Sequence, residues 1–80
     1  MNLEDVQRLV AARTHAASGS GRIIRKAAGL SIGEVAKHVG VSTPTIWKWE
    51  EGIHSPRGDA GRRWADLLAE LTGRKVSRAR

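Results

Sequence analysis

The sequence of 80 residues contains no cysteine and shows no strand-like alternation of apolar and polar residues. Without cysteine, a disulfide framework, a thiolate zinc site and a cysteine nucleophile are excluded. No apolar run reaches the length needed to cross a bilayer, and residues 1–5 are acidic rather than basic. We therefore expect neither a membrane span nor a signal peptide, which favours a cytoplasmic location.

Residue types that carry catalysis or bind metals are present but scattered. His15, His38 and His54 lie far apart along the chain, with no paired carboxylates near them. No serine stands in an activated arrangement, and no glycine-rich phosphate loop follows a strand. We expect no enzymatic activity, no metal, no cofactor and no small-molecule ligand.

Acidic residues are outnumbered, with 8 Asp and Glu against 14 Lys and Arg, for a formal net charge of +6. A small basic domain attracts polyanions, and nucleic acid first among them. Residues 74–80 hold Arg74, Lys75, Arg78 and Arg80 and no acid. We predict one domain over residues 1–73 and a flexible basic tail over 74–80. The tail either strengthens DNA binding through counterion release or is simply a solvated terminus.

Apolar residues at helical spacing, together with caps and glycine stops, predict five helices and an all-α fold. The first is expected over residues 3–17 and the second over 21–28, joined by a flexible link at 18–21. The expected N-caps of the second to fifth helices are Ser20, Ser31, Ser42 and Asp59. The glycines expected to end the last four helices are Gly29, Gly40, Gly52 and Gly73.

The inward faces follow from the same spacing. On the first helix, the residues that recur at three- and four-residue steps are Leu3, Val6, Leu9, Val10 and Arg13. On the second, Ile23, Ile24 and Ala27 are expected to face inward. On the other three, they are Val35, Ala36, Val39, Ile46, Trp49, Trp64, Leu67, Leu68 and Leu71. Trp47 is expected at the surface, either in a contact site or partly packed on the first helix. Arg62 and Arg63 are expected to be solvated.

Two short helices around Gly40 form the most informative segment, residues 31–52. Helices this short cross steeply instead of pairing along their length. Ala36 is small enough for close approach of the two backbones, and Gly40 permits a sharp turn. Val41 and Ile46 are expected to fill the wedge between the helices. The second helix then projects one face to solvent.

This segment resembles the Cro/C1 repressor-type, or XRE-like, helix-turn-helix family. Residues 30–36 and 40–52, followed by Pro56, carry the resemblance, which extends over residues 21–71 and leaves the first helix outside it. The resemblance implies a compact five-helix, lambda-repressor-like DNA-binding domain with an extra N-terminal helix. It also implies a sequence-specific transcriptional regulator of double-stranded DNA, a small repressor from a bacterium or phage.

Site residues are implied by the same resemblance. The positions that face bases in the major groove are Thr43, Pro44, Trp47 and Lys48. Those expected near the DNA backbone or minor groove are Ser31, Ser42, Thr45, Arg57, Arg22 and Lys26. Structural roles fall to Gly40, Trp49 and an internal ion pair between Arg25 and Glu50. Solvation is the alternative for Lys48, Arg57, Arg22 and Lys26.

Two positions depart from the family. Ile32 stands where many relatives have a glutamine that helps to hold a phosphate, and Glu51 places an acid where relatives often carry a basic or amide residue. Members of the family usually bind palindromic sites as homodimers, for which the first and fifth helices offer candidate surfaces. Monomeric binding is the alternative, since the sequence shows no long exposed apolar stripe. The alternative is a protein-interaction module, such as an antitoxin or adaptor, that uses the same helices; RNA binding is a weaker third option.

Overall fold

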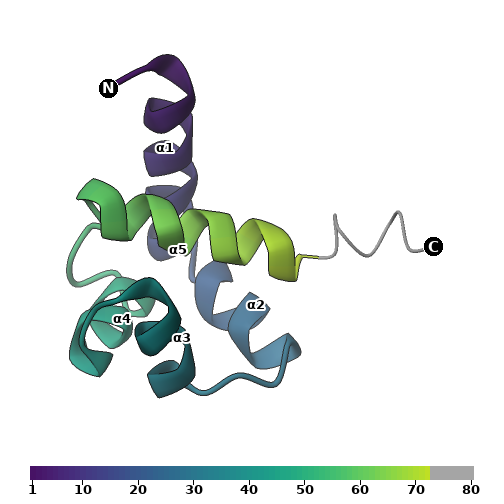
Figure 1. The fold of residues 1–80 in the computed structure, drawn as a ribbon. Coiled ribbons are helices and arrows are strands. Elements are labelled where there is room, and N and C mark those ends of the chain that lie inside the picture. The colour runs from purple at the N-terminus through teal and green to yellow at the C-terminus, as the bar shows by residue number, and fades with distance from the viewer. Residues whose placement is uncertain (73–80) are drawn as a thin grey trace.

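The computed structural model describes residues 1–72 and contains five helices, with no strand in that range. The helices are α1 (Leu3–Ser18), α2 (Ser20–Ala27), α3 (Ile32–Val39), α4 (Thr43–Glu50) and α5 (Gly58–Leu71). Helix α5 crosses α1, while α2, α3 and α4 gather on the other side of α5 (Figure 1). The predicted all-α, five-helix fold is confirmed. Gly73 and the basic stretch 74–80 lie outside the described residues.

Local capping chemistry explains where three of the helices begin. The side chain of Asn2 accepts a hydrogen bond from the Asp5 amide at 2.8 Å, as a cap of α1. Ser42 caps α4 in the same way, accepting from the Thr45 amide at 3.3 Å. At α3, Ser31 forms the predicted capping box, because its hydroxyl accepts from the Glu34 amide while the Glu34 carboxylate accepts from the Ser31 amide.

Two other helix starts differ from the prediction. Gly19, at φ +82°, turns the chain between α1 and α2 within one residue, so Ser20 begins α2 instead of capping it. The predicted flexible link is therefore reduced to a single glycine. At α5 the helix begins at Gly58, with Arg57 as N-cap, and Asp59 lies in the first turn. An acidic residue there still interacts favourably with the helix dipole.

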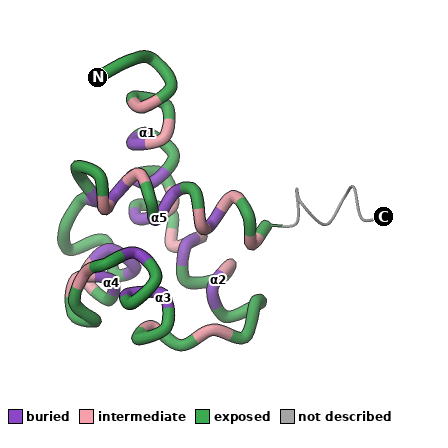
Figure 2. Tube along the Cα trace, viewed as in Figure 1, coloured by how far each residue is buried: buried purple, intermediate pink, exposed green. Residues whose placement is uncertain are grey.

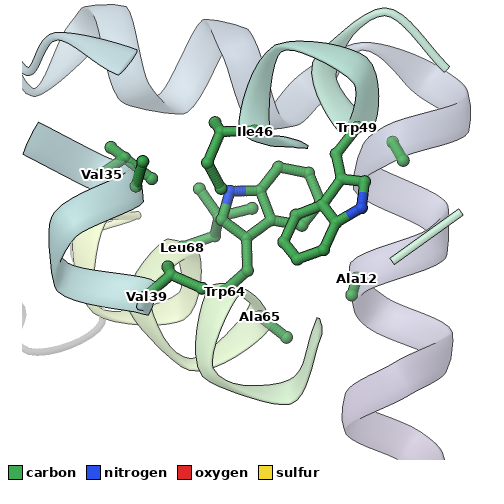
Figure 3. Packing of buried hydrophobic residues seen from close by; sticks show 10 residues of the cluster. Ala12, Val35, Val39, Ile46, Trp49, Trp64, Ala65 and Leu68 are labelled. Carbon is green, nitrogen blue, oxygen red and sulfur yellow. The ribbon is translucent and has the colours of Figure 1, made fainter. Parts of the chain in front are cut away.

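Two tryptophans lie at the centre of the core. Trp64 is fully buried and Trp49 is 5% exposed, and their ring centroids are 5.2 Å apart (Figure 3). Aliphatic side chains from α3, α4 and α5 close around them: Val35, Val39, Ile46 and Leu68. The core thus joins the α3–α4 pair to α5, and each of these helices has buried segments (Figure 2). The predicted burial of both tryptophans is confirmed.

Of the residues predicted to face inward on α2, Ile24 packs against the core, whereas Ile23 and Ala27 do not. In the apolar repeat of α1, only Leu9 is buried. Leu3, Val6 and Val10 are exposed, because α1 packs through Leu9, Ala12 and Ala16 on its other side. The small alanines of that side let α1 approach its neighbours closely.

In α2, Ile23 is 68% exposed and Ala27 is also at the surface. The buried residues of this helix are instead Gly21, beneath Trp64, and Arg25, which reaches Glu50. Gly21 is buried because the Trp64 ring packs against it, and Arg25 is buried because the Glu50 carboxylate pairs with it.

Among the described residues, no helix is both long and apolar enough to cross a bilayer. Over the same range, no three metal-ligating side chains come together.

Candidate nucleic-acid interface

A tight turn at Gly40 sets the angle between α3 and α4. Gly40 adopts φ +88°, and its amide and that of Val41 both donate to the Ala36 carbonyl, at 2.8 and 3.0 Å. This pairing satisfies the end of α3 while the left-handed glycine reverses the chain. Val41 is half-buried against the core, and Ile46 of α4 is fully buried. The wedge predicted between the two helices is therefore present.

The outer face of α4 presents Thr43, Pro44 and Trp47 to solvent. Trp47 is 45% exposed, whereas Trp49 of the same helix is buried. Lys48 lies at the edge of this face and is half-buried. We call Thr43, Pro44, Trp47 and Lys48 the α4 face. It combines one hydroxyl, one ammonium group and a broad apolar surface.

Ser42 and Thr45 point their hydroxyls toward each other at the start of α4, with 2.8 Å between the two oxygens. Ser42 also accepts from the Thr45 amide, so both side chains are engaged in closing the first turn. Since one hydroxyl donates to the other, the accepting hydroxyl keeps an O–H that can be donated outward. Their position at a helix N-terminus, where amide N–H groups point outward, suits contact with a phosphate.

The N-terminus of α3 adjoins that of α4. A Cβ atom built on Gly33 would lie 3.9 Å from the Thr43 hydroxyl and meet little else. Hydrogen bonds from Ser31, the backbone amide first, lower the pKa of Glu34. This ionised carboxylate accepts the hydrogen bond of the Ser31 amide, which is then not available to a ligand. The amides of Ile32 and Gly33, which have no intrahelical acceptor, are therefore the donors left for a phosphate.

A buried ion pair holds α4 on the side opposite the α4 face. The Arg25 guanidinium donates to both carboxylate oxygens of Glu50, at 2.6 and 3.1 Å, and to the Leu30 carbonyl at 2.8 Å. The side chains of Arg25 and Glu50 are 9% and 2% exposed. The structure thus contains the pair that the resemblance implied. It ties α2, the α2–α3 loop and α4 together, so the α4 face is held by a rigid support.

Comparison with known families identifies this arrangement. The family model described as "Helix-turn-helix domain" matches residues 22–79. The chain belongs to the helix-turn-helix family. Such domains are typically DNA-binding and non-enzymatic, which indicates a DNA-binding regulator. Searches of curated proteins and of solved structures return no match. Helix α1 lies outside the matched segment of this helix-turn-helix protein.

Basic residues surround the helix-turn-helix unevenly. Arg57 is exposed at the N-cap of α5, next to the fully buried Pro56. Lys26 is exposed on α2. Arg22 lies 3.9 Å from Glu51, at the C-terminal end of the α4 face. The positive charge of Arg22 therefore partly compensates the negative charge of Glu51, the acid that departs from the family pattern. Because of this pairing, the charge of Arg22 cannot be counted separately from that of Glu51.

Sequence reasoning missed one support of the turn. Arg63, expected to be solvated, donates through Nε to the Val39 carbonyl at 2.8 Å, at the end of α3. A basic side chain near helix-terminal carbonyls is favourable. The donor comes from α5, 24 residues away, so local sequence contained no signal for it. The neighbouring Arg62 pairs with Asp59 in the first turn of α5.

Proposed function

We propose that this helix-turn-helix protein is a sequence-specific transcriptional regulator of double-stranded DNA, of the Cro/C1 repressor type. It inserts α4 into the major groove. The observation that carries the proposal is the α4 face, exposed on a helix whose opposite side is held by the core and by the Arg25–Glu50 pair. A rigid projecting helix of eight residues fits the major groove, which admits an α-helix.

The α4 face defines how bases are read. Lys48 donates to the acceptors of guanine, and the Thr43 hydroxyl donates to or accepts from a base edge. Pro44 and Trp47 pack on thymine methyl groups or on the sugar wall. Readout therefore depends on apolar contact and one cation. Backbone phosphates are held by the α3 N-terminus, by Arg57 and Lys26, and by the basic residues 74–80.

The regulatory mechanism follows from the binding mode. A domain seated on a promoter excludes polymerase from the same DNA, so occupancy alone represses. A small repressor of a bacterium or phage, working in the cytoplasm, fits this description.

Substitutions on the α4 face test the proposal directly. A consensus site is first selected from a random duplex pool. Lys48→Ala is then expected to lower the preference for that site over random duplex by roughly 1–3 kcal/mol, about 5- to 150-fold, if it reads a guanine. Trp47→Ala is expected to lower the preference as well. The measurement is fluorescence anisotropy at several salt concentrations.

Lys37→Ala is the matched control, because it removes an exposed lysine from α3, outside the α4 face. It is expected to weaken both duplexes by a similar factor. If Lys48→Ala and Trp47→Ala both leave the preference unchanged, α4 does not read the groove.

The rival function is a protein-interaction module, which the exposure of Trp47 favours. Exposed aromatic residues are frequent hot spots of protein interfaces. The duplex selection decides between the two. A module of this kind enriches no consensus and binds duplexes only in proportion to their charge.

We further propose that the protein binds a palindromic site as a homodimer through α1. Leu3, Val6 and Val10 form an exposed apolar stripe, 71%, 43% and 56% exposed, at three- and four-residue spacing. The exposed side chains of α5 are charged: Asp59, Arg63, Asp66 and Glu70.

Charge also favours α1 as the contact between two copies. Helix α1 has two acidic residues and two arginines, and so a formal charge of zero apart from histidine, while the whole chain is at +6. Helix α5, the other candidate surface, has three acidic residues and two arginines, so two copies meet at α1 with less repulsion than at α5.

Val10→Asp tests the dimer, because it buries a charge in the proposed contact. We expect binding to the full palindrome to fall at least about tenfold, while binding to a half-site stays near wild type. Ala11→Asp, which places the same charge at an exposed position of α1 outside the stripe, is the control and is expected to change neither. Equal binding of Val10→Asp and wild type to the full palindrome excludes α1 as the dimer surface.

A further inference from the structure

Helix α1 reaches the loop that carries Arg57. The Nε atom of Arg13 donates to the Pro56 carbonyl at 3.0 Å, a contact between residues 43 positions apart. Pro56 is fully buried, and Leu9 and Gly61 enclose it from α1 and α5. A Cβ on Gly61 would come within 3.1–3.3 Å of Pro56 and Leu9, so the three residues are tightly packed.

The carbonyl that Arg13 holds belongs to the peptide bond joining Pro56 to Arg57. Peptide bonds are planar, so fixing this oxygen also fixes the direction of the Arg57 amide. On its other side, the Arg57 carbonyl accepts from the Gly61 amide at 3.0 Å. The backbone of Arg57 is therefore held by α1 before it and by α5 after it. Its side chain is exposed.

We propose that Arg13 is a positioning residue for DNA binding. It orients Arg57 toward a backbone phosphate, and through it α1 becomes part of the DNA-binding apparatus although it lies outside the family match. This inference rests on the proposed function. A cation on a pre-oriented backbone loses less conformational freedom on binding, and phosphate contacts fix the register of a protein on the duplex.

The test compares Arg13→Ala with Arg13→Gln in the full chain. Glutamine places an amide nitrogen at the same distance from Cα as the arginine Nε, so it keeps the donor and removes the charge. We expect Arg13→Ala to weaken binding to the selected duplex about 3- to 10-fold, and Arg13→Gln to restore most of that loss. Equal losses in the two variants would show that Arg13 acts by charge alone and overturn the proposal.

A double-mutant cycle shows whether Arg13 acts through Arg57. Arg57→Ala is expected to weaken binding and to reduce the salt slope by about one. Adding Arg13→Ala to Arg57→Ala is expected to cause no further loss, whereas additive losses contradict positioning. Arg8→Ala is the control, because Arg8 lies on α1 with the same charge but pairs with Asp5 and Asp66. It is expected to be additive with Arg57→Ala.

Hydrogen exchange in the DNA-free protein separates this inference from the proposed function. In Arg13→Ala, the Gly61 amide, which donates to the Arg57 carbonyl, is expected to exchange faster than in wild type, while the Gly40 amide at the α3–α4 turn is unchanged. Unchanged exchange at Gly61 overturns the positioning role even if the wild type binds DNA. A wild type that selects no duplex overturns the proposed function, whatever the exchange shows.

Discussion

Glu50→Ala is expected to lower the free energy of unfolding by about 3–5 kcal/mol, because it leaves a buried guanidinium without its partner. Arg25 is 7% exposed and makes two of its hydrogen bonds to the Glu50 carboxylate. An 80-residue domain has only about 4–12 kcal/mol of stability to lose. The loss is therefore a large fraction of the total, and it is measured as a lower midpoint in urea denaturation followed by circular dichroism.

Two further variants show whether the buried charge causes this loss. Asp66→Ala breaks the exposed Arg8–Asp66 pair and is expected to cost at most about 1 kcal/mol. The double variant Arg25→Met with Glu50→Leu removes both buried charges and is expected to be far more stable than Glu50→Ala. A Glu50→Ala protein as stable as Asp66→Ala would show that the buried pair does not support α4.

Gly21→Ala is expected to lower the free energy of unfolding by about 1–3 kcal/mol through overpacking. A Cβ at this position would lie 2.7 and 2.9 Å from Cζ2 and Cη2 of Trp64. The indole ring is fully buried and is packed among the core side chains. Alanine is a better helix former than glycine by roughly 0.5–1 kcal/mol, so the clash must exceed this gain.

Gly33→Ala is the matched comparison, since Gly21 and Gly33 are each the second residue of their helix. A Cβ on Gly33 meets its nearest atom at 3.8 Å, an ordinary contact, so the substitution is expected to stabilise by up to about 1 kcal/mol. In thermal melts, the melting temperature is expected to fall for Gly21→Ala and to rise for Gly33→Ala. If Gly21→Ala is as stable as Gly33→Ala, Trp64 does not pack against α2 as described.

Trp64→Phe extends this comparison. The smaller ring leaves space above Gly21, so Gly21→Ala is expected to cost less in that background than in wild type. This coupling is the direct measure of the contact between the two residues.

Local signals in the sequence were sufficient to find the helices. Asn2, Ser31 and Ser42 cap their helices through side-chain oxygens that reach amides three residues later, and a contact of that range is visible in a short window. Gly40 is equally local, because a left-handed turn favours glycine wherever it occurs.

The orientation of α1 and α2 could not be predicted in this way. Helix α1 has two apolar stripes, one of Leu3, Val6 and Val10 and one of Leu9, Ala12 and Ala16. Helical spacing alone does not decide which stripe faces the core, and the structure buries the second. The small stripe allows closer approach to α5, and that advantage depends on the shape of a surface distant in sequence.

In the candidate site, too, the exposed residues could be predicted from the sequence, whereas the contacts that support them could not. The exposure of Thr43, Pro44 and Trp47 follows from their places on a helix whose other side is apolar. The supports behind the site do not follow from local pattern. Arg13 meets Pro56 across 43 residues and Arg63 meets Val39 across 24, and each bond joins a polar side chain to a backbone carbonyl that any residue could supply.

The sequence by itself determined five helices, the glycine turn between α3 and α4, and the residues exposed on α4. These depend on caps, glycine stops and helical spacing, which act over a few positions. Only the tertiary structure decided that α1 turns its larger apolar side to solvent, that Gly21 lies against Trp64, and that α1 holds the loop before Arg57. Such choices depend on complementary shapes and on donors meeting carbonyls across distant segments. They are settled when the helices pack together.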